Sequence, residues 1–359
     1  MSITLAAINA EQLLLTEVML NMDHVTLGTT GITVNKNGFG ALPIQRITEG
    51  EAEYLLKKAF KNGITFFDTA RFYTDSEKKI GLALSDAREK IIIATKTPSG
   101  EPDAFWQNLK ASLEMLKTDY IDIYQFHNPA FCPKPGDGSG LYEAMLEAKT
   151  QGKIRHIGFT NHRLDLVRQA AESGLYETIQ YPFSYLASAQ ELDFVMFCKE
   201  KGIGVLAMKA LSGGLITNSA AAYAFLMQFY NVIPIWGVQF EKELDEFIAY
   251  QDNPPAFDDA VKHAIERDVM ELGGEFCRGC GYCLPCPADI QIPMAARMSL
   301  LIKRAPASMW LSDHWKENMQ NIENCLDCGH CKDHCPYNLD TPNLLRANLA
   351  DYRKEVYHK

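Results

Sequence analysis

The sequence predicts an α/β protein in which a parallel (β/α)8 barrel is followed by a small, mostly α-helical, cysteine-rich domain. Two observations carry this prediction. Between about residues 37 and 250, short apolar runs alternate with amphipathic segments, which is typical of βαβ units. Beyond them, eight of the ten cysteines fall in two tight runs near the C-terminal end. The two parts of the chain therefore differ in architecture and in chemistry.

Eight apolar runs predict the barrel strands, namely Gly38–Leu42, Thr65–Asp68, Ile91–Thr95, Ile121–Gln125, Ile154–Gly158, Thr178–Gln180, Gly204–Ala207 and Val232–Ile235. The predicted barrel helices are Gly50–Asn62, Ser76–Ser85, Pro102–Leu116, Gly140–Gln151, Leu164–Glu172, Ala189–Lys201, Asn218–Phe229 and Glu241–Tyr250. Strands that alternate with helices form right-handed units, and eight units in about 215 residues suit a closed barrel. A doubly wound open sheet is the alternative, but no G-x-G-x-x-G motif follows the first strand.

The composition divides the chain into three predicted parts. Residues 1–23 form an N-terminal tail without an assigned role, residues 24–256 form the barrel, and residues 257–359 form a linker helix and the cysteine-rich domain. Within the barrel part, Val25–Asn35 is predicted as a hairpin that plugs the barrel bottom. In the last part, the predicted helices are Asp258–Leu272, Pro293–Arg304 and Ser312–Ile322.

The overall charge and hydropathy exclude several classes of protein. A net charge of −10 argues against a general nucleic-acid binder, because such a protein needs a basic face. No stretch of about 18 apolar residues is present, so no membrane span is predicted. Glu11 and Glu17 interrupt the apolar N-terminus, which argues against a secretory signal. Cys132 and Cys198 lie far apart and are expected to be buried hydrophobes. We therefore expect a protein of the reducing cytoplasm.

The two cysteine runs have the spacing of iron–sulfur ligands. The runs consist of Cys277, Cys280, Cys283 and Cys286, and of Cys325, Cys328, Cys331 and Cys335. Three cysteines separated by two residues, with a fourth followed by proline, are typical of a bacterial [4Fe–4S] site. Zinc usually needs only four ligands, and a disulfide framework suits short secreted chains. Both alternatives fit two runs of four cysteines less well.

The fourth cysteine of each run is expected to serve the other run's cluster. In two-cluster ferredoxins, the cysteine before proline ligates the opposite cluster. The sequence therefore predicts two [4Fe–4S] clusters, with Cys335 completing the first and Cys286 completing the second. The first run departs from the usual spacing, because only two residues separate Cys283 from Cys286.

Ionisable residues close three consecutive predicted strands of the barrel. Asp68 and then Tyr73 follow the second strand, Lys96 closes the third and His127 closes the fourth. Chemistry in a parallel barrel is located at the carboxyl ends of the strands. The set suits proton delivery to a carbonyl oxygen. Tyrosine is a poor acid at neutral pH, and a neighbouring lysine cation is expected to lower its pKa.

These motifs resemble the aldo/keto reductase family. The resemblance rests on NGITFFDTARFYTDSE, which contains Asp68 and Tyr73, on Lys96 and His127, on GKIRHIGFTNH at residues 152–162, and on QYPFS from Gln180. It implies that Asp68, Tyr73, Lys96 and His127 are the catalytic tetrad, with Tyr73 as the general acid. The implied substrate is a small carbonyl compound or alcohol, and the implied cofactor is NAD(H) or NADP(H).

The resemblance also implies a set of nicotinamide contacts. Asn161 and Gln180 match the positions that contact the carboxamide, and Phe183 matches the position of a stacking aromatic ring. The segment MKALSGG resembles the loop over the pyrophosphate and contributes Lys209, Leu211 and Gly213. After the eighth strand, Glu241–Glu246 is acidic where many members are basic, which disfavours a preference for NADPH.

Three functions are compatible with this combination. The first is a nicotinamide-dependent carbonyl/alcohol oxidoreductase whose clusters serve electron exchange, sensing or structure. The second is a reductase that a redox partner such as a ferredoxin supplies with electrons through the clusters. The third is a redox-sensing or docking protein on a reductase scaffold. The intact tetrad argues against the third, and fold alone decides none of them.

Overall fold

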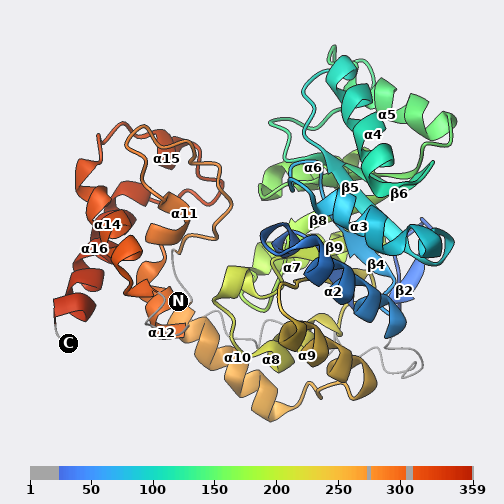
Figure 1. The fold of residues 1–359 in the computed structure, drawn as a ribbon. Coiled ribbons are helices and arrows are strands. Elements are labelled where there is room, and N and C mark those ends of the chain that lie inside the picture. The colour runs from blue at the N-terminus through green and yellow to red at the C-terminus, as the bar shows by residue number, and fades with distance from the viewer. Residues whose placement is uncertain (1–23, 273–275, 305–309, 358–359) are drawn as a thin grey trace. The chain divides into compact units, whose positions relative to one another are not determined.

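The computed structural model describes residues 24–272, 276–304 and 310–357, and its described residues form two compact units (Figure 1). The barrel unit holds the described residues up to Ala210, together with Ala220–Val261. The cysteine unit holds Leu211–Ser219 and the described residues from Lys262 onward. The predicted tail, residues 1–23, lies outside the described residues. None of the described helices is long and apolar enough to cross a bilayer.

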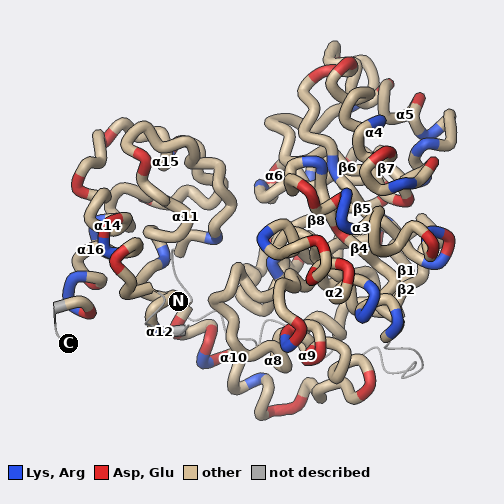
Figure 2. The backbone as a smooth tube through the Cα atoms, viewed as in Figure 1, with Lys and Arg blue, Asp and Glu red and all other residues tan. Residues whose placement is uncertain are grey.

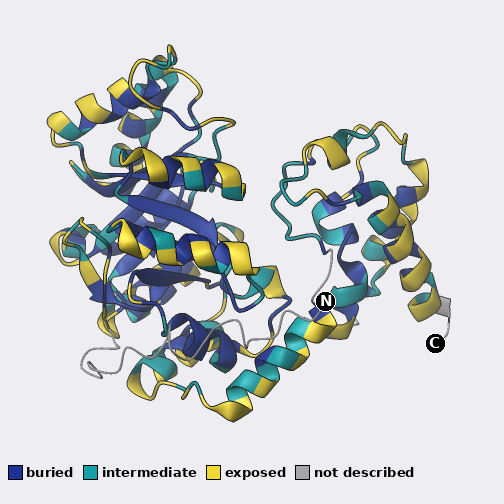
Figure 3. Cartoon of the chain, turned by 180° about the vertical axis from the view of Figure 1, so that it is seen from behind, coloured by how far each residue is buried: buried dark blue, intermediate teal, exposed yellow. Residues whose placement is uncertain are grey.

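Eight parallel strands close into a barrel, which confirms the predicted fold. They are β3 (Gly38–Gly40), β4 (Phe66–Asp68), β5 (Ile92–Thr97), β6 (Ile121–His127), β7 (Ile154–Thr160), β8 (Thr178–Pro182), β9 (Gly204–Met208) and β10 (Val232–Gly237). Neighbours in sequence pair in register around the ring, and β10 closes it by pairing with β3. The strands are almost fully buried, so they form the dark interior of Figure 3.

Helices surround the strands, and most of them bury one face, whereas α8 is buried along almost its whole length. They are α2 (Glu49–Lys61), α3 (Ser76–Leu84), α4 (Pro102–Leu116), α5 (Leu141–Thr150), α6 (Leu164–Ser173), α7 (Ala189–Glu200), α8 (Ser219–Leu226) and α9 (Glu241–Asp252). These match the predicted helices, except that α8 is shorter than expected. After Leu226 the helix gives way to a three-residue turn, in which the amide of Gln228 donates to the carbonyl oxygen of Phe225. Such three-residue turns commonly end a helix.

A hairpin covers one end of the barrel, as the sequence predicts. Strand β1 (His24–Thr26) pairs antiparallel with β2 (Thr33–Asn35). Val25, Leu27 and Val34 pack in one cluster with strand residues such as Ile123 and Leu206. Gly28 bridges to Ile203, directly before β9 begins, so the hairpin lies at the amino ends of the strands. The carboxyl ends remain available for a site.

The cysteine unit is helical and has no strand among its described residues. Its helices are α10 (Asp259–Leu272, which begins in the barrel unit), α11 (Ile292–Ala295), α12 (Met298–Arg304), α14 (Asp313–Gln320), α15 (His330–Asp333) and α16 (Thr341–Tyr357). The single helix predicted at Pro293–Arg304 is wrong, because Ala296 and Arg297 form a turn between α11 and α12. The long α16 was not predicted.

Candidate active site and cluster sites

The tetrad residues lie together at the carboxyl ends of β4, β5 and β6. Asp68 is the last residue of β4, Lys96 lies near the end of β5, and His127 ends β6. Strand pairing sets Lys96 beside Gln125, two residues before His127. Tyr73 follows in the loop after β4, and its ring centroid lies 5.9 Å from that of His127. The structure therefore brings all four side chains to one rim.

Lys96 and Asp68 form a buried ion pair. The Lys96 Nζ atom lies 2.7 and 2.9 Å from the two Asp68 carboxylate oxygens and 2.6 Å from the Thr69 carbonyl oxygen. Burial raises the pKa of Asp68, and Lys96 opposes this shift. Burial likewise lowers the pKa of Lys96, and Asp68 opposes this shift. With three acceptors, Lys96 uses all its donors inside the protein.

Tyr73 differs from the sequence-based expectation in the direction of its pKa shift. The Lys96 Nζ atom lies 5.3 Å from the centroid of the Tyr73 ring. Burial and the negative charge of Asp68 nevertheless raise the pKa of Tyr73. The expected lowering is wrong because Lys96 is paired with Asp68, which leaves little net positive charge beside the phenol. Tyr73 therefore keeps its proton at neutral pH and is available as a proton donor.

His127 is a neutral imidazole in this environment. Burial and the Lys96 charge lower its pKa to about 3. Its Nδ1 atom is buried and makes no hydrogen bond to any residue that the structure describes. A neutral ring carries a single N–H, so His127 can donate one hydrogen bond without changing charge. That property suits the orientation of a carbonyl group.

A second layer of buried polar side chains supports the tetrad. Glu77 accepts hydrogen bonds from Thr95 at 2.7 Å and from Ser112 at 2.8 Å, and it pairs with Arg71. Its carboxylate also acts on the pKa of Lys96. The sequence motif contained Glu77 without revealing this role. Only the fold brings α3, α4 and β5 together around it.

Gln180 joins the same network from β8. The Gln125 amide donates to the Gln180 side-chain oxygen at 3.0 Å, and Gln180 hydrogen bonds with Asp68. Gly158 makes this arrangement possible, because a Cβ atom there would lie 2.7 Å from Gln125 Cγ. Sequence reasoning missed the roles of Gln125 and Gly158, since neither carries a charge and the motif that contains Gly158 does not show what this glycine packs against.

Asn161 and Phe183, two more of the predicted nicotinamide contacts, lie at the same end of the barrel unit. Asn161 follows β7, and its amide donates to the Pro129 carbonyl oxygen at 2.9 Å. Phe183 follows β8 and is buried, with its ring centroid 5.0 Å from that of Phe229. His162 is also buried, and its pKa is lowered by burial and then by Lys209 and His127.

The segment after β9 has an unusual backbone. Lys209, Ser212 and Gly213 have left-handed φ angles of 54°, 49° and 66°, and Gly214 has a φ of 91°. Successive amides in such conformations can form a concave anion-binding nest. Lys209 belongs to the barrel unit, as do Asn161, Gln180 and Phe183. Leu211 and Gly213 belong instead to the cysteine unit, so the structure does not unite the six predicted contacts in one unit.

Each cysteine run curls around its second cysteine. In the first run, Gly279 and Gly281 flank Cys280 with φ angles of 62° and 89°. In the second run, Asp327 and Gly329 flank Cys328 with φ angles of 49° and 76°. The left-handed residues turn the chain back on itself at equivalent positions. The two runs therefore share one local design.

The similarity continues after the fourth cysteine of each run. Asp289 and Asn338 each take a left-handed φ, 53° and 52°, and each amide bonds to the carbonyl of the fourth cysteine. Helices α11 and α16 begin shortly afterwards. The fourth cysteines thus have matching surroundings, although their spacing from the third cysteine differs by one residue. The shorter spacing between Cys283 and Cys286 therefore leaves the backbone conformation after the fourth cysteine unchanged.

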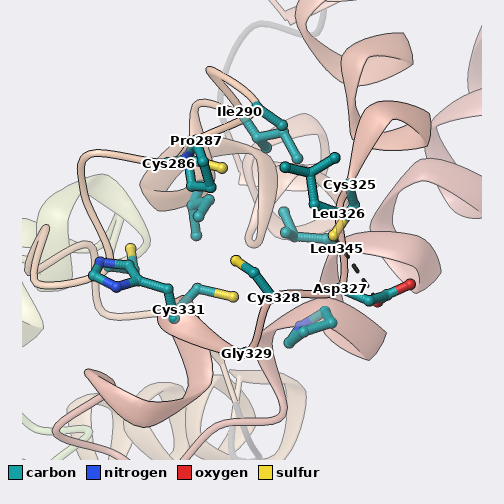
Figure 4. Close-up of a pocket in the computed structure, with 15 residues that line it drawn as sticks. Cys286, Pro287, Ile290, Cys325, Leu326, Asp327, Cys328, Gly329, Cys331 and Leu345 are labelled. Atoms are coloured by element: carbon teal, nitrogen blue, oxygen red, sulfur yellow. Dashed lines mark hydrogen bonds between the residues drawn. The ribbon is translucent and has the colours of Figure 1, made fainter.

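The fourth cysteine of the first run lies in a pocket with the second run (Figure 4). Thiols of Cys286, Cys325, Cys328 and Cys331 line this pocket, which has an empty volume of about 370 Å³. Cys283 lines it as well. The remaining lining is mostly apolar, with Pro287, Ala288, Ile290, Ile292, Leu326, Pro342 and Leu345.

The donor set fits iron–sulfur clusters. No disulfide joins any of the ten cysteines, all of which lie within the described residues, so the disulfide alternative gains no support there. Burial raises the pKa of Cys283 to about 12, and Cys277, Cys280 and Cys331 add to the shift. Thiolates gathered this closely need bound cations. Within the described residues, no three of His, Cys, Asp and Glu converge on a single ion. Cys132 and Cys198 are buried, as predicted.

This fold and this tetrad define an oxidoreductase on a (β/α)8 barrel that is joined to a domain of iron–sulfur type. The chain belongs to the aldo/keto reductase family, whose model matches residues 26–224. A second model, for a 4Fe-4S dicluster domain, matches residues 276–340. Both assignments confirm the resemblance that the sequence motifs carry.

Named relatives cover the barrel region. L-galactose dehydrogenase of Arabidopsis thaliana is 32% identical over 219 residues, which is 56% of this chain and 69% of that protein. NADH-specific methylglyoxal reductase of Escherichia coli is 29% identical over 228 residues, or 55% of this chain and 70% of that protein.

Solved structures share the fold. A holo aldo-keto reductase from Bacillus halodurans superposes with a TM-score of 0.61 at 21% identity, over 69% of this chain and 96% of that one. An aldo-keto reductase from Klebsiella pneumoniae in complex with NADPH gives 0.59 at 20% identity, over 69% and 95%.

Proposed function

We propose that this protein interconverts a carbonyl and an alcohol on a small organic substrate, with a nicotinamide nucleotide as cofactor and two [4Fe–4S] clusters in the cysteine unit. The tetrad at the carboxyl ends of β4, β5 and β6 carries the proposal, with its Lys96–Asp68 distance of 2.7 Å. The relatives act, by their names, on a sugar and on methylglyoxal, which supports a small oxygenated substrate. Free thiols and clusters suit a reducing cytoplasm.

In the proposed reaction, Tyr73 donates its phenolic proton to the carbonyl oxygen. A bound reduced nicotinamide would supply the hydride to the carbonyl carbon. Lys96 is held by Asp68 and Thr69, so its charge stays near the phenol as the proton leaves. His127 donates one hydrogen bond that orients the carbonyl. In alcohol oxidation the same phenol oxygen would take the proton back.

The proposed nicotinamide contacts are Asn161, Gln180, Phe183, Lys209, Leu211 and Gly213. Amide side chains complement a carboxamide, and the left-handed backbone at residues 209 and 212–214 suits a pyrophosphate. Gln180 is already fixed by Gln125, which leaves part of its amide for a ligand. The donor chemistry therefore fits a nicotinamide nucleotide.

For the coenzyme, we propose that NADH is used at least as well as NADPH. The start of α9 is acidic, with Glu241, Glu243, Asp245 and Glu246, and both red and blue positions occur in α2 (Figure 2). Lys58 of α2 is a cation near the start of α9. Its Nζ atom forms ion pairs at 2.5 Å with both Glu241 and Asp245. Little positive charge then remains for a 2′-phosphate. Dissociation constants for both coenzymes test this, and clearly tighter binding of NADPH would contradict it.

We also propose that the two clusters are cross-ligated. Cys325, Cys328 and Cys331 would hold one cluster with Cys286, because these four thiols line one pocket. The matching backbone after Cys335 extends the same inference to the first run. Cys277, Cys280, Cys283 and Cys335 would then hold the other cluster.

An electron-exchange role is the second candidate for the clusters. Cys328 is exposed, and the adjacent Leu326 is 66% exposed, so one edge of the second cluster would reach the surface. A protein partner such as a ferredoxin could exchange electrons there. Photoreduced ferredoxin should then reduce the clusters rapidly, and no electron transfer on mixing would contradict this role.

The reaction is tested by Tyr73→Phe. Only the phenol hydroxyl is removed, so carbonyl reduction should fall by about 10²–10⁴-fold while nicotinamide affinity stays near wild type. Tyr120→Phe is the matched control, because Tyr120 directly precedes β6 at the opposite end of the barrel. Steady-state rates with small aldehydes and titrated nicotinamide binding measure both effects. An unchanged rate in Tyr73→Phe would remove Tyr73 from the acid role.

A further inference from the structure

Arg297 is a buried cation that pairs with no carboxylate among the residues that the structure describes. It lies in the turn between α11 and α12 and is 7% exposed. Its Nη1 atom donates to the Gly213 carbonyl oxygen at 3.2 Å, and its Nη2 atom lies 3.2 Å from the Met294 sulfur. Its Nε atom has no partner among the described residues, and no acidic side chain there pairs with it. A buried guanidinium without a neutralising anion strongly destabilises a folded protein, so we expect an anion beside Arg297.

Two glycines leave space for the Arg297 guanidinium. A Cβ atom on Gly279 would lie 3.3 Å from Arg297 Cζ, and one on Gly213 would lie 2.7 Å from Arg297 Nη1. The neighbouring Gly281 and Gly214 also have positive φ angles, yet a Cβ atom on either would meet nothing within 4 Å. Any side chain at the first two positions would therefore displace Arg297. The guanidinium therefore packs between two segments of the cysteine unit, one at Gly213 and one at Gly279.

Among the described residues, the first cysteine run lies close to Arg297. Gly279 lies between Cys277 and Cys280, and its amide lies 3.4 Å from Cys277 Sγ. Pro293, one helical turn before Arg297, has its carbonyl oxygen 3.9 Å from the same sulfur. Burial lowers the pKa of Arg297, and the Cys277 thiolate opposes that effect. Arg297 therefore packs against the loop that carries Cys277 and Cys280, where an iron–sulfur cluster would add its own negative charge.

We propose that Arg297 is the buried counter-charge of the cluster held by Cys277, Cys280 and Cys283, and that it ties the segment Leu211–Ser219 to that cluster. The proposal rests on the proposed occupancy of the first run. Reduction adds one electron and makes the cluster more negative, so a nearby fixed cation stabilises the reduced form. Net charge and hydrogen bonding around a cluster are among the factors that set its potential.

The hydrogen bond from Arg297 to Gly213 should make the segment Leu211–Ser219 depend on the first cluster. This segment follows β9 directly and contains two of the proposed nicotinamide contacts, Leu211 and Gly213. Through the Gly213 carbonyl, Arg297 joins it to the loop that carries Cys277 and Cys280. Loss of the first cluster should therefore loosen the segment.

The charge is tested with Arg297→Gln and Arg297→Lys in the full chain. Arg353→Gln is the matched control, because Arg353 lies on α16 in the same unit and pairs with Glu323 in solvent. We measure iron content and the midpoint potential of each cluster by paramagnetic resonance during anaerobic redox titration. In Arg297→Gln, one cluster should shift to lower potential or be lost, while the other is unchanged. Arg297→Lys and Arg353→Gln should keep both near the wild-type potentials.

The link between Arg297 and residues 211–219 is tested with Gly279→Ala and Gly281→Ala. Both glycines have a positive φ, but only the methyl group at position 279 would contact Arg297. Hydrogen exchange of residues 211–219 should accelerate in Gly279→Ala and in Arg297→Gln, and it should stay slow in Gly281→Ala. Unmoved potentials in a fully loaded Arg297→Gln protein would overturn the counter-charge, as would identical behaviour of Arg297→Gln and Arg297→Lys. Unchanged exchange in Gly279→Ala would overturn the tie. Wild-type protein with only one cluster would instead overturn the proposed cluster count together with this proposal.

Discussion

Lys96 makes three hydrogen bonds inside the protein, and this engagement limits its influence on Tyr73. The ion pair with Asp68 is nearly neutral as a unit, so burial dominates the pKa of the phenol. The positions of the tetrad residues could be predicted from the sequence, because each follows a recognisable strand. The direction of the Tyr73 pKa shift could not, since it depends on how the charges pair in three dimensions.

His127 gives a prediction for the pH dependence of the reaction. Its pKa of about 3 lies far below the ordinary value of 6.5, so His127 stays neutral through the range in which histidine usually titrates, about pH 5 to 8. The kcat/KM for carbonyl reduction should therefore show no ionisation of His127 in that range. An inflection near neutral pH that disappears in His127→Gln would contradict this assignment.

The same shift has a consequence for stability, with a defined sign. The unfolded chain binds a proton at His127 below about pH 6.5, whereas the folded protein does so only near pH 3. His127 therefore favours unfolding progressively as the pH falls from 6.5 toward 3. Denaturant unfolding of wild type and His127→Gln should diverge in this window and run parallel above it.

At the scale of elements, β7 and β6 are fitted together around Gly158. A methyl group there would lie 2.5 Å from Thr178 Oγ1 and 2.7 Å from Gln125 Cγ. Gly158→Ala should therefore destabilise the barrel by about 1–3 kcal/mol and weaken nicotinamide binding by displacing Gln125 from Gln180. Gly50→Ala is the control, because a Cβ atom on Gly50, in α2, meets nothing within 4 Å. Equal effects of the two variants on unfolding and binding would contradict the role of Gly158.

The doubled cysteine motif predicts which cluster each fourth cysteine serves. Cys286→Ser should perturb the cluster of Cys325, Cys328 and Cys331, and Cys335→Ser should perturb the other cluster. Cys132→Ser, which changes a buried thiol of the barrel, should perturb neither. Iron counting and paramagnetic resonance measure the outcome. Damage confined to each variant's own run, or about four irons in place of eight, would contradict the crossed scheme.

Most elements could be predicted from the sequence because apolar runs ended in polar or turn residues. All eight strands were anticipated, together with the hairpin β1–β2. The helix α16 was missed because its sequence, from Thr341 to Tyr357, contains Pro342 and many polar residues. The break at Ala296–Arg297 was missed because no glycine or proline marks it.

At the scale of the whole molecule, the proposed function combines two chemistries in one chain. A hydride carrier delivers two electrons at once, whereas an iron–sulfur cluster carries one at a time. Segment Leu211–Ser219 follows a barrel strand but belongs to the cysteine unit, and this could not be read from the sequence. The spacing of motifs identifies both parts, but the membership of a short loop depends on its packing.

The most direct test of the proposed function is the fate of deuterium from reduced nicotinamide labelled at the transferable position. Cluster-loaded protein, labelled NADH and a small aldehyde are mixed without oxygen, and the alcohol is analysed by mass spectrometry. Direct hydride transfer predicts that the carbonyl carbon of nearly every product molecule carries deuterium. Unlabelled alcohol, with its new hydrogen taken from water, would mean that electrons arrive through the clusters and would contradict the hydride mechanism.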